Sequence, residues 1–71
     1  MDYREIQSSV ISGVSHDPDN DTLTIHFHQG RKYTFFGVPE DIAQQLVESE
    51  SPGRFFHQGI KPYYEALESD D

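Results

Sequence analysis

Polar and apolar residues alternate along residues 22–28, which read Thr-Leu-Thr-Ile-His-Phe-His. A period of two is typical of a half-buried strand, so this pattern predicts a strand with Leu23, Ile25 and Phe27 facing the core. A second stretch, residues 31–36, is rich in aromatic side chains and predicts another strand. Because so few residues separate the two stretches, we expect them to form a hairpin.

The length of the hairpin loop decides which face carries the aromatic side chains Tyr33 and Phe35. A two-residue loop, Gln29-Gly30, would place them on the polar face of the first strand, whereas a three-residue loop, residues 28–30, would place them on its apolar face. Gly30 suits the left-handed position that closes a three-residue loop, and this register also keeps the polar side chains together. We therefore predict the three-residue loop, with Tyr33 and Phe35 turned inward.

The stretch upstream of this hairpin predicts a third, weaker strand. Residues 8–16 contain Val10, Ile11 and Val14, and we expect them to form an edge strand. The segment Asp-Pro-Asp-Asn-Asp at residues 17–21 is dense in turn-forming residues and would connect this strand to the next one.

The hydrophobic period changes to that of a helix after residue 38. Pro39 is placed to occupy a first helical position, and the apolar residues that follow recur at three and four residues: Ile42, Ala43, Leu46 and Val47. Ser51 is placed to cap a second short helix whose apolar side carries Phe55, Phe56 and Ile60, and Lys61-Pro62 would end it.

Strands followed by helices predict an α+β fold. We expect a three-stranded antiparallel β-meander followed by two helices packed on one face of the sheet. The predicted domain spans residues 1–64, and residues 65–71 are expected to form a flexible acidic tail.

Length and charge narrow the class of protein. The chain has 71 residues, no cysteine, and a formal net charge of −8 from 13 acidic and 5 basic side chains. Disulfides and thiolate metal sites are therefore excluded. No apolar run approaches the length of a membrane span, and the first residues lack the features of a signal peptide, so we expect a cytoplasmic protein without membrane contact.

The negative charge is uneven along the chain. Without residues 65–71, nine acidic and five basic side chains remain, which is a net charge of −4. A strongly acidic chain disfavours a broad nucleic-acid surface, but this distribution leaves room for a local site that binds an anion. A chain this short also has a small core, so a monomer and a homodimer both stay open.

Two patterns resemble metal sites, and in each the simpler interpretation is favoured. The spacing Asp17-x-Asp19-x-Asp21 begins like a calcium loop but lacks the later glycine and glutamate, which favours a solvated turn. His26-x-His28 with His16 offers too few ligands for zinc, which favours exposed histidines. We expect no metal or other cofactor. Because no nucleophile motif or paired carboxylate stands out, we also expect no enzymatic activity.

Basic and aromatic side chains gather in residues 53–61. Arg54, His57 and Lys61 are three and four residues apart, so a helix would present them on one face, where they could bind a phosphate or the carboxylate of a partner. A solvated helix face is the competing interpretation. Arg31 and Lys32 could extend such a site. Tyr33 is a further candidate, since exposed sheet aromatics can stack on RNA bases, but core packing with its hydroxyl at the rim is the favoured interpretation.

Several short motifs together resemble the KTSC domain, a family named for its occurrence at the C-terminus of some lysyl-tRNA synthetases and also found as a stand-alone bacterial protein. The matching positions, in chain order, are Ser8-Ser9, Ile11, Asp17-Pro18, Leu23-x-Ile25-x-Phe27, Gly30-x-x-Tyr33-x-Phe35-Phe36-Gly37-Val38-Pro39, Ser51-x-Gly53-Arg54-Phe55-Phe56, Ile60-Lys61 and Tyr63-Tyr64. The chain departs from the family pattern at Phe35, where a second tyrosine is usual, and at His57, where asparagine is usual.

The resemblance implies a small domain without an established enzymatic activity, with RNA binding suggested by the synthetase context. Two functions follow as expectations. The first is an accessory module that binds RNA weakly through Arg54, His57 and Lys61 with Arg31, Lys32 and Tyr33. The second is a protein-interaction domain or homodimer that uses the strand at residues 8–16 or an aromatic surface patch.

Overall fold

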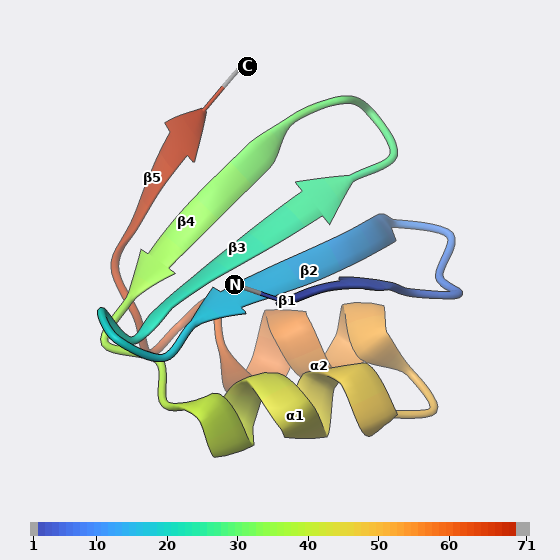
Figure 1. The fold of residues 1–71 in the computed structure, drawn as a ribbon. Coiled ribbons are helices and arrows are strands. Elements are labelled where there is room, and N and C mark those ends of the chain that lie inside the picture. The colour runs from blue at the N-terminus through green and yellow to red at the C-terminus, as the bar shows by residue number, and fades with distance from the viewer. Residues whose placement is uncertain (1, 70–71) are drawn as a thin grey trace.

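The structure, a computed structural model, describes residues 2–69 and consists of one antiparallel sheet with two helices on one of its faces (Figure 1). The strands follow one another in the sheet in chain order, and they are β1 (Asp2–Glu5), β2 (Ile11–Asp17), β3 (Thr22–Phe27), β4 (Lys32–Phe36) and β5 (Ala66–Ser69). The helices α1 (Glu40–Glu48) and α2 (Pro52–Gly59) lie between β4 and β5 in the chain.

The predicted α+β class and the packing of both helices on one face are confirmed, but the predicted number of strands is wrong. The sheet has five strands rather than three, because β1 pairs with β2 on one side and β5 pairs with β4 on the other. Residues 8–16 were expected to form an edge strand, yet β2 lies inside the sheet because β1 covers its outer edge.

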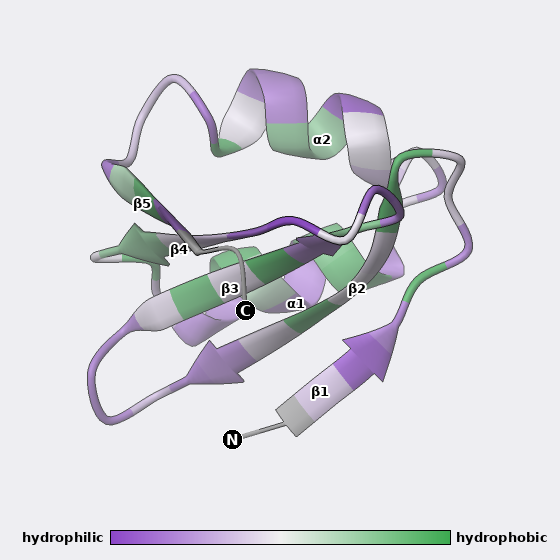
Figure 2. Cartoon of the chain, turned by 90° about the horizontal axis from the view of Figure 1, so that it is seen from above, coloured by the Kyte–Doolittle hydropathy of each residue, from purple (hydrophilic) through white to green (hydrophobic). Residues whose placement is uncertain are grey.

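The β3–β4 hairpin has the predicted three-residue loop. The amide of Phe27 donates to the carbonyl oxygen of Arg31 at 2.9 Å, and Gly30 adopts a φ of +91°. The resulting register pairs Ile25 with Tyr33 and places both side chains on the face that the helices cover. Figure 2 shows the alternation of hydrophobic and hydrophilic positions along β3 that fixes this choice of face.

The core lies between this face of the sheet and the two helices. Its fully buried side chains are Ile11, Val14, Leu23, Ile25, Val38, Leu46 and Ile60. Helix α1 begins one residue later than predicted, because Pro39 is its N-cap rather than its first helical residue. Helix α2 begins as predicted, with Ser51 at the N-cap position and Pro52 in the first turn, but the Ser51 side chain forms no capping hydrogen bond.

His16 is buried in this core rather than exposed as the sequence suggested. Its side chain is 8% exposed, and its Nε2 lies 2.7 Å from the carbonyl oxygen of Val38, at the connection between β4 and α1. A carbonyl oxygen can only accept, so Nε2 carries the hydrogen. This bond ties the entrance of α1 to the centre of the sheet.

Four residues of the predicted acidic tail, residues 65–71, form a strand of the sheet. Ala66–Ser69 form β5, in which Glu68 lies opposite Tyr33 and Leu67 lies opposite Thr34. The amide of Phe36 also donates to the carbonyl oxygen of Glu65 at 3.0 Å. The sheet therefore extends beyond residue 64, whereas Asp70 and Asp71 lie outside the described residues.

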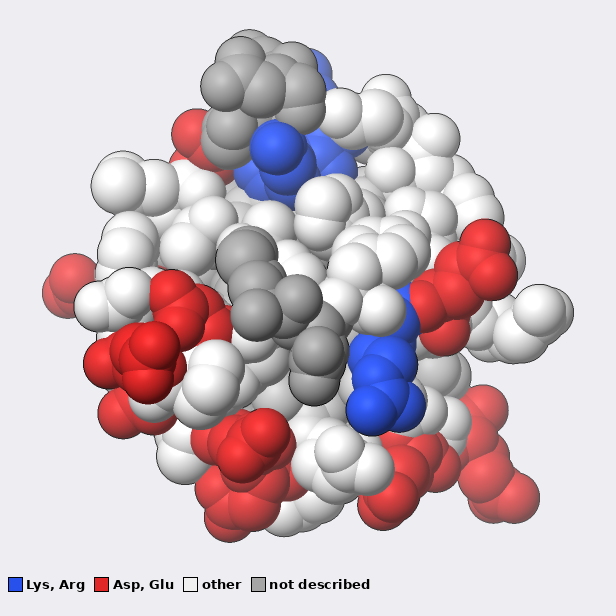
Figure 3. Space-filling model, viewed as in Figure 1, with Lys and Arg blue, Asp and Glu red and all other residues white. Residues whose placement is uncertain are grey.

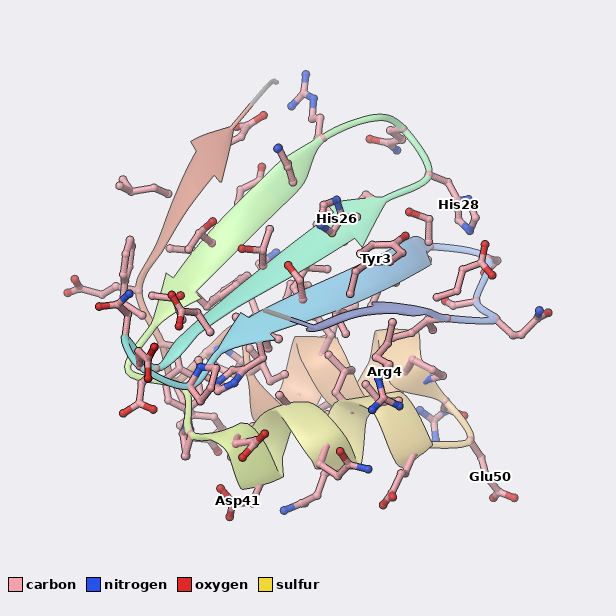
Figure 4. All side chains as sticks on the ribbon, viewed as in Figure 1. Tyr3, Arg4, His26, His28, Asp41 and Glu50 are labelled. Atoms are coloured by element: carbon pink, nitrogen blue, oxygen red, sulfur yellow. The ribbon has the colours of Figure 1, made fainter. Side chains whose placement is uncertain are left out.

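The second face of the sheet carries no helix in the part of the chain that the structure describes (Figure 1). Tyr3 crosses this face and contacts His26 edge-on, with 5.1 Å between the ring centroids (Figure 4). The Tyr3 ring occupies the space that a side chain at Gly13 would fill, since a Cβ added at Gly13 would overlap it. Gly13 therefore allows Tyr3 to hold β1 against the sheet.

His26 lies on the face of the sheet without helices, called the open face below, and makes the stability of the fold depend on pH. Burial lowers the pKa of His26 below its usual 6.5, and the charge of Lys32, directly opposite on β4, lowers it further. Between the lowered pKa and 6.5 the unfolded chain binds more protons than the folded chain, so stability should fall as the pH drops through this range. Urea unfolding at a series of pH values checks this, because His26→Gln should flatten the slope in that range.

A variant at Lys32 separates the two causes of the lowered pKa of His26. In Lys32→Gln, an NMR titration should give His26 a higher pKa that still lies below 6.5, because burial is the larger cause. An unchanged pKa in Lys32→Gln would contradict the assignment of the second cause.

Neither α1 nor α2, the helices of residues 2–69, combines the length and the apolar character that a membrane-spanning helix requires.

Candidate functional site

One hollow gathers half of the side chains that the sequence proposed as a site. It has a volume of about 260 Å³ and lies between α2 and the helix-covered face of β3 and β4. Three of the predicted candidates line it and are brought together by the fold: Tyr33, His57 and Lys61. The other lining residues are Val10, Phe27, Phe35 and Phe56.

Helix α2 positions the two basic side chains of this hollow. His57 lies within the helix, whereas Lys61 lies in the turn that follows, after the C-cap Ile60. The amides of Ile60 and Lys61 both donate to the carbonyl oxygen of Phe56, at 3.1 and 2.9 Å, which closes the end of the helix. The expectation that one continuous helix face carries Arg54, His57 and Lys61 is therefore wrong, and Arg54 lies outside the residues that line the hollow.

Aromatic rings form the walls. Phe56 is 5% exposed and contacts Phe27 and Phe35 edge-on, with centroid distances of 5.6 and 5.4 Å. Phe27 meets Tyr33 at 5.7 Å with the rings nearly perpendicular, and His57 is tilted against Phe56 at 5.5 Å. Edge-to-face contacts of this kind hold the rings in fixed orientations, so the walls of the hollow are already ordered.

The Tyr33 hydroxyl and Arg31 share a partner on β5. The hydroxyl donates to Oε1 of Glu68 at 3.2 Å, and Nη1 of Arg31 lies 3.1 Å from Oε2 of the same carboxylate. The negative charge of Glu68 thereby offsets the positive charge of Arg31. Since both charged side chains are well exposed, the ion pair adds little to stability.

Lys32 is separated from the hollow by the sheet itself. Successive side chains of a strand point to opposite faces, so Lys32 lies on the open face with His26 while Tyr33 lies on the helix-covered face. Figure 3 shows the surface of the molecule in the same view as Figure 1. Acidic side chains lie mostly towards the rim of this view. The six predicted site residues thus divide between the hollow, the Glu68 contact, the open face and the outer side of α2.

The sequence did not identify Phe27 and Phe35 as part of a site. Both were interpreted as core residues, which they also are, and Phe56 was noted only as a core aromatic within the basic segment. Val10 was assigned to a strand although it lies in the preceding loop. The signal that could have found the hollow is the combination of inward-facing Tyr33 and Phe35 with basic residues near the end of α2.

This arrangement suits a flat, partly apolar group that carries a negative charge nearby. Aromatic side chains offer faces and edges to a planar ring, while the Lys61 ammonium and the His57 imidazole offer hydrogen-bond donors for an oxyanion. Among the described residues, no group of three or more His, Asp and Glu side chains is arranged to hold a metal ion.

Comparison with known proteins places the chain in a family. The family model of the KTSC domain matches residues 7–64. An uncharacterized protein of Stutzerimonas stutzeri is 36% identical over 59 residues, which cover 83% of each chain. A lysine–tRNA ligase of a Nostoc species is 34% identical over 55 residues, which cover 78% of this chain and 10% of the ligase.

A solved structure agrees with the sequence relatives. The crystal structure of a KTSC domain protein from Yersinia pestis superimposes with a TM-score of 0.90, is 34% identical in sequence, and covers 96% of both chains. The match therefore includes nearly all of the sheet and both helices. The chain belongs to the KTSC domain family.

Proposed function

We propose that this domain binds single-stranded RNA weakly, with one base in the hollow beneath α2 and an adjoining phosphate at Lys61 and His57. The observation that carries the proposal is the juxtaposition of the partly exposed rings of Phe27 and Tyr33, backed by buried Phe35 and Phe56, with two basic side chains around one hollow of about 260 Å³. Proteins recognise unpaired bases by stacking them on aromatic side chains and by contacting the backbone with basic residues. Aromatic and basic side chains both line this hollow.

The relatives support a role near RNA. Three of the matching proteins are named lysine–tRNA ligases, in each of which the similar segment makes up about 10% of the chain. The matching segment is therefore a small part of those proteins. We infer that the present chain also acts on RNA.

The charge of the chain limits the strength of binding. With a net charge of −8 and Glu68 close to Tyr33, the domain can neutralise few phosphates. With one phosphate contacted by Lys61 and His57, the logarithm of the binding constant should fall with the logarithm of salt concentration with a slope of about −0.7 for a single strand. Binding should therefore be weak and should weaken further as the salt concentration rises to the physiological range.

Fluorescence anisotropy with a labelled single-stranded oligouridylate at low salt tests the proposal. Lys61→Gln should weaken binding about threefold to tenfold, because a charged contact with a phosphate is lost. Lys32→Gln makes the same change of charge on the opposite face of the sheet and should leave the affinity within about twofold. Equal losses in both variants, or no binding by the wild-type protein at low salt, would overturn the proposal.

The alternative, a protein-interaction domain or homodimer, loses the edge strand on which it partly rested, because β1 pairs with β2. Its remaining support is apolar exposure: Tyr3, Phe36 and Leu67 are 53%, 44% and 67% exposed, and their registers put all three on the open face. Light scattering at high protein concentration distinguishes the two functions. A mass of one chain that binds oligouridylate supports the RNA proposal, and a dimer that does not bind it supports the alternative.

A further inference from the structure

A second hollow lies at the other end of the sheet, between β1, β2 and α1. Its volume is about 120 Å³, and it shares no lining residue with the hollow beneath α2. Val14 and Ala43 contribute apolar surface, and the polar lining residues are Arg4, His16, Glu40 and Gln44. A cavity of about 150 Å³ can hold a molecule the size of benzene, so this hollow has room for a ligand of a few heavy atoms.

His16 lines this hollow and also carries a buried nitrogen without a partner. Its Nε2–H donates to the carbonyl oxygen of Val38, and in the tautomer with this single N–H the other ring nitrogen, Nδ1, is an acceptor. That Nδ1 is buried and has no hydrogen-bond partner among residues 2–69. Buried polar atoms are nearly always satisfied in native proteins. An unsatisfied acceptor in a side chain that lines a hollow therefore indicates a missing donor.

The remaining polar side chains bring opposite charges to the same hollow. Arg4 extends from β1 towards the helices (Figure 4), and Glu40 stands in the first turn of α1. Neither forms an ion pair within the described part of the chain, although both line the hollow. The Gln44 amide nitrogen donates to Glu48 at 2.8 Å, which leaves its carbonyl oxygen as a further acceptor.

We propose that this hollow is a binding site for a small zwitterion of the α-amino-acid class. The carboxylate of the ligand binds the Arg4 guanidinium, while its ammonium group donates to the Glu40 carboxylate and to Nδ1 of His16. Arginine suits a carboxylate because its planar donors match both oxygens. An ammonium group supplies three donors, enough for Glu40, His16 and the carbonyl oxygen of Gln44.

Ligands with one charge fit this hollow less well. A simple anion would meet Arg4 but also face the Glu40 carboxylate, and a simple cation would meet Glu40 but face the Arg4 guanidinium. A like charge that close is unfavourable, whereas a zwitterion places an opposite charge against each side chain. The two unpaired charges therefore select for a ligand that carries both signs.

NMR titration with glycine, acetate and methylammonium, each added alone, tests this proposal. Glycine should produce saturable amide shifts around the hollow with a dissociation constant in the millimolar range, and it should shift the ¹⁵N resonance of His16 Nδ1 as that atom gains a donor. Acetate and methylammonium should bind at least about fivefold more weakly. Glycine that causes no shifts, or that binds no better than acetate, would overturn the proposal.

Three variants assign the contacts. Arg4→Gln and Glu40→Gln should each weaken glycine binding about fivefold or more, because each removes one charged partner at an exposed position. Glu50→Gln makes the same charge change as Glu40→Gln, on an exposed residue that points away from the hollow (Figure 4), and should leave binding unchanged. Equal losses in Glu40→Gln and Glu50→Gln would contradict the site.

His16→Gln tests the buried acceptor. A glutamine amide can still donate to the carbonyl oxygen of Val38, but it lacks an atom equivalent to Nδ1. A folded His16→Gln protein should bind glycine about threefold to tenfold more weakly than the wild type. Unchanged affinity in this variant would remove His16 from the site.

Discussion

Replacing Phe56 with alanine is expected to lower the free energy of unfolding by about 3–5 kcal/mol. Phe56 is 5% exposed and contacts Phe27 and Phe35 from the helix side of the core. Its removal loses buried apolar area and leaves a cavity that aromatic neighbours, already fixed by edge-to-face contacts, fill only in part. Because small domains have a total stability of only about 5–15 kcal/mol or less, Phe56→Ala should be largely unfolded on moderate warming.

Urea unfolding followed by circular dichroism measures this loss, and Phe36→Ala is the matched control. Phe36 is 44% exposed on the open face of the sheet, one residue after the inward-facing Phe35. The same truncation there should change the free energy of unfolding by less than about 1 kcal/mol. If the two variants lost similar stability, the assignment of the helix-covered face as the core would be wrong.

Replacing His16 with leucine is expected to lower the free energy of unfolding by about 1–3 kcal/mol. Val38 is fully buried, and its carbonyl oxygen accepts the hydrogen bond from His16 Nε2 at 2.7 Å. Leucine would fill most of the same space but would leave that oxygen without its donor. An unsatisfied buried acceptor carries its full desolvation penalty, so the loss of the bond outweighs the gain in apolar burial.

His16→Gln distinguishes this penalty from a simple change of shape. The glutamine amide can restore the donor to the Val38 carbonyl oxygen, so His16→Gln should retain more stability than His16→Leu. Thermal unfolding of both variants under the same conditions gives the comparison. A His16→Leu protein as stable as the wild type would show that the bond to Val38 contributes nothing to the fold.

The central hairpin and the two helices could be predicted from sequence because their signals are local. Strand β3 alternates without interruption, Gly30 fixes the loop length, and Pro52 marks the start of α2. These features depend on neighbouring residues alone, so no knowledge of the tertiary structure was needed.

The outer strands could not be predicted in the same way. Strands β1 and β5 have four residues each and carry charged side chains such as Arg4 and Glu68, which resemble a loop or a solvated tail. They form strands because the sheet offers them an unpaired edge. The Tyr3 ring over Gly13 and the Tyr33 hydroxyl bound to Glu68 then fix them in place, and both contacts join residues distant in sequence.

The candidate site could be predicted only in part, because its arrangement also depends on contacts between residues distant in sequence. His57 and Lys61 were recognised as a basic group near aromatic residues, but their place depends on where α2 ends. Lys32 and Tyr33 are neighbours in the chain, yet the sheet separates them, which only the face assignment reveals. Buried His16 could not be distinguished from an exposed histidine before the position of Val38 was known.

Titration of the protein with single-stranded oligouridylate at low salt, followed through amide chemical shifts, is the sharpest test of RNA binding in the hollow beneath α2. We expect saturable shifts around this hollow, at Phe27, Tyr33, Phe56, His57 and Lys61, and small or no shifts at His26 and Lys32 on the open face. Shifts concentrated on the open face, or no shifts at all, would contradict it.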